Sequence, residues 1–103
     1  MIDLIKSKLL IDAQVAQDKG HYVLAVDKYH KYLEQDPFNG FALNNLSVIY
    51  INQAKLELAK EIIIFSLQYS LYVVSQLKHL GIVYLLKSRH PNATKLLEHA
   101  QQS

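Results

Sequence analysis

Five histidines are the side chains of this sequence with the widest chemical repertoire: His21, His30, His79, His90 and His99. Their spacing matches no metal-ligand pattern, and the chain has no cysteine to complete a zinc site. We also recognise no glycine-rich phosphate loop, no nucleophile elbow and no paired-carboxylate cleft. We therefore expect a non-catalytic protein that has no metal site and needs no cofactor.

The composition predicts one compact domain. Half of the 103 residues are hydrophobic, which is too many for a disordered chain and enough for one modest core. The formal net charge is +2, and the sequence contains no run of like charges. Proteins that bind nucleic acid or an anionic membrane usually carry a cluster of basic residues, and this balance of charge gives no sign of one. We therefore expect neither as a partner.

The apolar segments of the chain do not have the properties of targeting or membrane segments. Asp3, Lys6 and Lys8 interrupt the N-terminal apolar residues, whereas a signal peptide needs an uncharged core. The longest charge-free run covers residues 62–77 and contains several serines and glutamines. Such a run is too short and too polar to cross a bilayer, so we expect a cytoplasmic protein without membrane insertion.

Residues 20–37 define the element around which the chain is organised. Gly20 permits the strained backbone of a sharp turn, while Pro37 cannot continue a helix and pushes Asp36 toward an extended conformation. Between Gly20 and Pro37, apolar residues recur at steps of three and four and so share one helical face. They are Tyr22, Ala25, Val26, Tyr29, Tyr32 and Leu33.

The same periodicity predicts six helices in all. They cover roughly residues 2–18, the stretch between Gly20 and Pro37, and residues 41–53, 56–69, 73–87 and 91 onward. Pro91 suits the first turn of the last helix. The turn PFNG, residues 37–40, separates the second helix from the third.

The chain aligns with itself, without insertion or deletion, when Ala25 is placed on Ala59 and Ala59 on Ala93. We call the separation of these alanines in the sequence one repeat. A shift by one repeat keeps small residues on small ones and large residues on large ones. The other aligned sets are Tyr29, Ile63 and Leu97; Leu9, Leu43 and Leu77; Ala13, Ser47 and Gly81; and Tyr50 and Tyr84. Three such units account for nearly the whole chain.

These units resemble the tetratricopeptide repeat, a helix–turn–helix unit of about 34 residues. The third unit matches the repeat pattern best, with Leu77, Leu80, Gly81, Tyr84, Ala93, Leu97 and Ala100 in place. The second unit has Ser47 in place of the pattern's glycine, and the first has Asp12 where a core leucine is expected. The resemblance implies an all-α superhelix of six antiparallel helices in one domain, residues 1–103, with repeats at about 6–39, 40–73 and 74–103.

In this family, partners bind the concave surface that the first helix of each repeat forms. Aligned to the repeat, the candidate groove residues are Leu10, Gln14, Phe41, Asn44, Asn45, Val48, Ile51, Asn52, Lys78, His79, Ile82, Leu85 and Leu86. Members that grip a C-terminal carboxylate use Lys, Asn and Arg at set positions, and only Asn45 agrees here. The resemblance therefore favours an apolar or amphipathic helical segment of another protein as the ligand. His79 projects toward this groove, where it either meets a carboxylate or an amide of the ligand or is a solvated side chain.

Two alternatives accompany this interpretation. The size and the apolar groove are similar to those of small type III secretion chaperones that hold a secreted subunit. The other alternative is a self-associating scaffold that forms a homodimer through its uncapped ends or through Ile62 and Phe65, unless these two are ordinary surface residues. A shift of one residue in the register would instead place Val48, Ile51, Ile82 and Leu85 in the core between helices.

Overall fold

The computed structural model describes residues 4–69 and 72–89, and these residues form five helices and no strand. The helices are α1 (Leu4–Asp18), α2 (Tyr22–Gln35), α3 (Gly40–Asn52), α4 (Leu56–Gln68) and α5 (Val73–Arg89). The prediction of an all-α fold is confirmed, and the first five predicted helices begin and end within two or three residues of the observed ones. The sixth, predicted from Pro91, lies outside the described residues.

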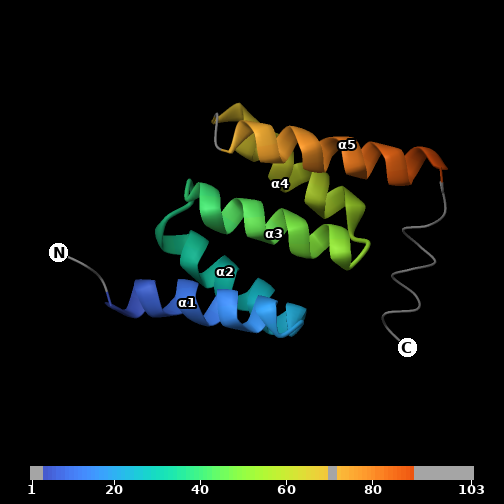
Figure 1. Ribbon diagram of the computed structural model, residues 1–103. Helices are drawn as coiled ribbons and strands as arrows, with labels where there is room; N and C mark the ends of the chain where they lie inside the picture. The colour runs from blue at the N-terminus through green and yellow to red at the C-terminus, as the bar shows by residue number, and fades with distance from the viewer. Residues whose placement is uncertain (1–3, 70–71, 90–103) are drawn as a thin grey trace.

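The five helices form two layers (Figure 1). In that view α1, α3 and α5 lie side by side in front, and α2 and α4 lie behind them. Most contacts join neighbours in the sequence: α1 packs on α2, α3 on α4, and α4 on α5. Between the last two helices, Lys87 of α5 also forms an ion pair with Glu57 of α4. None of the helices in the described residues is both long enough and apolar enough to span a membrane.

The turns of the first two helix pairs close with the same hydrogen bonds. At the α1–α2 turn the backbone N–H of His21 donates to the carbonyl oxygen of Ala16 over 2.8 Å. At the α3–α4 turn the N–H of Lys55 donates to the carbonyl of Tyr50 over the same distance. This is the closure of a Schellman-type helix end, and donor and acceptor both move by one repeat from the first turn to the second. The repeat seen in the sequence is therefore also a structural repeat in α1 to α4.

The corner between α2 and α3 is fixed by polar side chains. Asn39 caps α3, because its side-chain oxygen accepts a hydrogen bond of 2.9 Å from the N–H of Ala42. Asp36 accepts hydrogen bonds from the Tyr32 hydroxyl at 3.0 Å and from the Asn39 amide at 3.3 Å, and it pairs with Lys6 of α1 at 3.5 Å. Burial acts to raise the pKa of Asp36, but these bonds prevail and lower it.

The core lies along the contact between the layers, and small residues occupy its tightest positions. Ala13, Ala25, Ser47 and Ala59 are completely buried, which allows the backbones of paired helices to approach closely. Larger buried side chains fill the spaces between the helices: Tyr29, Tyr32, Leu43, Leu46, Ile49, Tyr50, Leu56, Ile63 and Val83.

One side of α5 breaks the pattern of the other helices. On α3 the residues Leu43, Ser47 and Tyr50 are at most 6% exposed. The residues one repeat later on α5 are Leu77, Gly81 and Tyr84; Leu77 is 55% exposed, Tyr84 is 50% exposed, and Gly81 is also exposed. A Cβ added to Gly81 would meet nothing within 4 Å. Among the described residues, this side of α5 is therefore covered in part, with Lys60 of α4 over the ring of Tyr84.

Candidate functional site

The predicted groove residues lie on the front layer of the fold, on α1, α3 and α5. We call this surface the α1–α3–α5 face. Most of its predicted members are half-buried: Leu10, Phe41, Asn44, Asn45, Val48, Ile51, His79, Ile82 and Leu86. The exposed members are Gln14, Asn52, Lys78 and Leu85. The thirteen positions therefore share one layer, and none belongs to the fully buried core.

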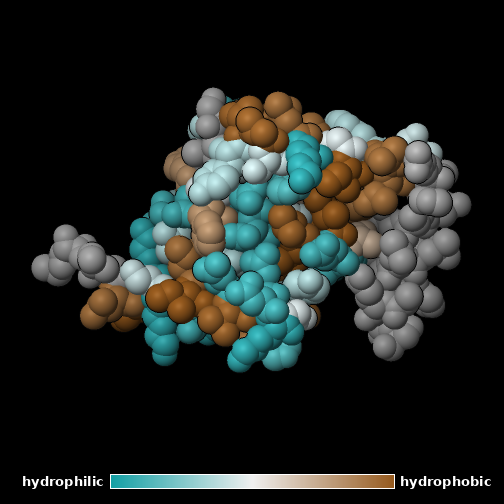
Figure 2. All heavy atoms as spheres, viewed as in Figure 1, coloured by the Kyte–Doolittle hydropathy of each residue, from teal (hydrophilic) through white to brown (hydrophobic). Residues whose placement is uncertain are grey.

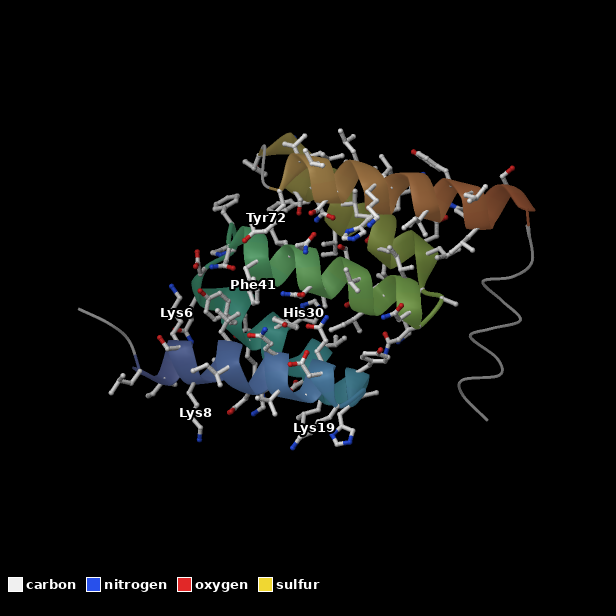
Figure 3. The ribbon with its side chains drawn as sticks, viewed as in Figure 1. Lys6, Lys8, Lys19, His30, Phe41 and Tyr72 are labelled. Carbon is white, nitrogen blue, oxygen red and sulfur yellow. The ribbon has the colours of Figure 1, made fainter. Side chains whose placement is uncertain are left out.

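Helix α3 forms the middle of this face. Phe41, Asn45, Val48 and Asn52 follow each other at steps of three and four residues, so they share one side of the helix. Figure 3 shows Phe41 between α1 and α3. This ridge alternates apolar side chains with amides, which suits a ligand that has both apolar and polar groups.

The amide of Asn45 connects α3 to the first helix pair. Its nitrogen donates to the carbonyl oxygen of Phe41 at 3.1 Å, and its oxygen accepts from the Gln17 amide of α1 at 3.4 Å. Gln17 in turn accepts a hydrogen bond of 2.7 Å from the hydroxyl of Tyr29. Burial, and the charge of Asp18, raise the pKa of Tyr29 to about 12, so this hydroxyl keeps its proton and remains a donor at neutral pH. Asn45 is therefore part of the scaffold as well as of the face.

A buried polar network sets the orientation of α5. Gln76 is fully buried; its amide nitrogen donates to the hydroxyl of Ser66 on α4 at 3.0 Å, and its oxygen lies 3.2 Å from the hydroxyl of Ser47 on α3. His79, one turn further along α5, places Nδ1 3.1 Å from the same Gln76 oxygen. Because these contacts come from both α3 and α4, they hold His79 and Ile82 toward α3. The sequence analysis missed Gln76, because only its partners on α3 and α4 distinguish it from an exposed glutamine.

His79 stays neutral on this face at physiological pH. Burial, and then the positive charge of the neighbouring Lys78, lower its pKa below the ordinary value of 6.5. A neutral imidazole offers a ligand one donor and one acceptor, and the Gln76 contact already occupies Nδ1. The Nε2 atom remains for a polar group of a ligand.

Several apolar members of the predicted site also contribute to packing within the chain. Leu10, Ile51 and Leu86 are partly buried and pack against the core. The same holds for Ile62, one of the two residues predicted for self-association. Its companion Phe65 stacks on Phe38 with ring centroids 5.8 Å apart and also meets Tyr69 at 4.9 Å. The role of all these residues in binding stays a prediction.

The surface chemistry of the front layer is mixed (Figure 2). Apolar residues gather along α1 and toward α5, and polar residues lie between them. This mixture favours a ligand with its own alternation of apolar and polar groups over a purely apolar one.

Two hollows lie at the α1–α2 hairpin. One, of about 350 Å³, is lined by Asp12, Val15, Ala16, Lys19, His21, Leu24 and Lys28. Another, of about 680 Å³, adjoins the turn and the start of α2, with Gly20, His21, Tyr22, Val23, Leu24 and Asp27 in its lining. Sequence reasoning did not anticipate either hollow, because each is formed by residues of both the turn and a helix and depends on how these are assembled.

Within residues 4–69 and 72–89, no group of three or more His, Cys, Asp or Glu side chains is placed to hold a metal ion. Comparison of the chain with protein-family models, curated proteins and solved structures gave no match. The resemblance to the tetratricopeptide repeat therefore rests on the residues and on the internal repeat of the structure.

Proposed function

We propose that this chain is a protein-interaction module of the tetratricopeptide type, which binds an amphipathic helical segment of a partner on the α1–α3–α5 face. The observation that carries the proposal is the set of half-buried apolar side chains on adjacent helices of one layer: Phe41 and Val48 on α3, and Ile82 on α5. A ligand helix with apolar residues at steps of three and four would contact both helices.

The repeated turn supports the family assignment within this proposal. Identical closing hydrogen bonds at the α1–α2 and α3–α4 turns, one repeat apart, are the arrangement expected of stacked helical repeats.

The polar groups of the face narrow the chemistry of the ligand. Lys78 is exposed on α5, beside the neutral His79, and no acidic residue belongs to the predicted set. The amide of Asn52 lies 3.4 Å from the hydroxyl of Tyr22, where α3 ends beside α2. We therefore expect a ligand helix with an apolar row and an acidic or amide residue that lies over Lys78.

An affinity capture tests this proposal. The wild-type chain, Ile82→Glu and Val48→Glu serve as baits in native extract, with Val23→Glu as the matched control. Val23 is 81% exposed on α2 and does not belong to the predicted face. One protein enriched by the wild type and by Val23→Glu, and lost with both face variants, supports the proposal.

The second step uses the enriched protein in purified form. Titration of a peptide from its amphipathic helix should shift the amide resonances of α3 and α5, and the two face variants should abolish the shifts. Equal capture by all four folded baits would refute binding on this face.

A further inference from the structure

The outward side of α1 carries an apolar stripe that the repeat does not use. Leu4 is 78% exposed, Ile11 61% and Val15 45%, although the opposite side of the same helix buries Ala13 and Ala16 completely or nearly so. These three residues, at steps of seven and four, form one line along the helix. We call this line the outer stripe. α1 lies at one end of the front layer, so no helix of the described residues stacks on its outer side.

We propose that the outer stripe is the interface of a homodimer in which the α1 helices of two copies pair in antiparallel orientation. Such a pairing is isologous, so every contact occurs twice, and the surface must be complementary to itself. The sequence of α1 meets this condition in both its apolar and its charged residues.

The self-complementarity follows from positions along α1. A two-fold axis midway between Leu4 and Val15 places each of these residues beside the other in the second copy. The midpoint between Lys8 and Asp12 lies only half a residue away, less than about 1 Å along the helix. One axis therefore pairs the apolar ends of the stripe and also places each Lys8 near the Asp12 of the other copy.

The side chains have the exposure that this arrangement needs. Lys8 is exposed, and Figure 3 shows it pointing away from the other helices. Asp12 is half-buried at the rim of the hollow of about 350 Å³, whose apolar lining includes Val15 and Leu24. In the pairing described, Leu4 of the second copy lies over Val15 at this hollow, so the most exposed residue of the stripe becomes buried.

The proposed dimer shares no residue with the proposed partner face. From α1 the partner face takes Leu10 and Gln14, whereas the outer stripe consists of Leu4, Ile11 and Val15. Two paired helices bury less surface than a standard interface of about 1,600 Å², so we expect a dimer that dissociates in the micromolar range.

Sedimentation equilibrium from low to high micromolar concentration tests this proposal on the complete chain. The wild type should show a monomer–dimer equilibrium. Ile11→Glu should remain monomeric over the whole range, because the pairing brings two buried carboxylates close to the axis. Val74→Glu, an equally drastic change at an exposed site on α5, should dimerise as the wild type does.

Charge reversal gives the sharper measurement. Lys8→Glu and Asp12→Lys each replace two attractive contacts per dimer with repulsive ones, so each should raise the dissociation constant about tenfold. The double variant restores both contacts in exchanged form and should return to the wild-type constant. Circular dichroism checks that all variants are folded.

A monomeric wild type at every concentration would overturn the proposal, and the outer stripe would then belong to another protein or to another segment of this chain. So would a dimer that Ile11→Glu leaves intact, or a double variant that dimerises no better than the single ones. None of these three results affects capture through the α1–α3–α5 face, which the Ile82→Glu bait tests separately.

Discussion

Ala54 at the α3–α4 turn has the same left-handed backbone as Gly20 at the α1–α2 turn, with φ angles of 59° and 76°. The two residues lie one repeat apart and end their helices in the same way. Glycine adopts this conformation without steric cost, whereas alanine, through its Cβ, does not. The second turn therefore repeats the geometry of the first with a less suitable residue.

Replacing this alanine should stabilise the protein. We expect Ala54→Gly to raise the free energy of unfolding by about 1 kcal/mol, because it removes the strain of the left-handed residue. Urea unfolding measures the change. Ala13→Gly, in the interior of α1, is the control and should lower the stability by a similar amount. A destabilising Ala54→Gly would contradict the assignment of strain to this turn.

The buried network around Gln76 should be needed to hold α5 in place. Gln76→Leu removes the partner of the Ser66 hydroxyl and should lower the free energy of unfolding by about 1–3 kcal/mol. Hydrogen exchange of the α5 amides should accelerate more than that of α1. Gln68→Leu, the same substitution at an exposed position on α4, is the control and should leave both quantities unchanged. An unchanged stability of Gln76→Leu would mean that packing alone positions α5.

The exposed side of α5 gives a direct test of the sixth helix. If the predicted sixth helix, from Pro91 onward, packs there, Leu77→Asp and Leu97→Asp should each lower the free energy of unfolding by about 2–5 kcal/mol, and their effects should be non-additive in a double-mutant cycle. Val23→Asp, at a position on α2 that is 81% exposed, should change it by less than about 0.5 kcal/mol. A Leu77→Asp variant as stable as Val23→Asp would show that this side stays in contact with water.

His79 should make the stability depend on pH. Its pKa in the folded state lies below the ordinary value of 6.5, so the unfolded chain binds the proton more readily. The contribution of His79 is therefore complete above pH 6.5 and is lost as the pH falls from there through the folded-state pKa. Unfolding curves of the wild type and of His79→Asn should diverge above this window and converge below it. An NMR titration midpoint of His79 at or above 6.5 would contradict the prediction.

Asp36 should make the stability depend on pH in a more acidic range. Its folded-state pKa lies below 3.8, so its hydrogen bonds with Tyr32 and Asn39 contribute to stability above that value. The contribution disappears as the pH falls through the folded-state pKa. Asp36→Asn should therefore be less stable than the wild type at neutral pH and approach it in strong acid. Because Asp36 is partly exposed, high salt should reduce the part of the difference that comes from Lys6.

The helices could be predicted from the sequence because local signals define them. Gly20, Pro37 and the turn at residues 37–40 mark their ends, and apolar residues at steps of three and four mark their buried sides. The candidate groove residues came instead from the alignment to the tetratricopeptide repeat, and they lie on α1, α3 and α5.

The features that sequence reasoning missed depend on which side chains of other elements each side of a helix contacts. In the sequence, Gln76 cannot be distinguished from an ordinary exposed polar residue. Its buried position becomes evident only from its contacts with Ser47 and Ser66. Phe65 reads as a surface residue, but the turn before α3 brings Phe38 against its ring. Such relationships arise only when helices far apart in the sequence are assembled, and periodicity alone does not contain them.

The pairing of each helix chiefly with its neighbour in the sequence also determines how the chain acquires its structure. Contacts between adjacent elements need only short loops to close, so the entropic cost of the first packing step is small and folding is fast. During synthesis α1 and α2 can associate before α5 has left the ribosome. The chain therefore grows onto a structure that already exists, one helix at a time, from its first residues to its last.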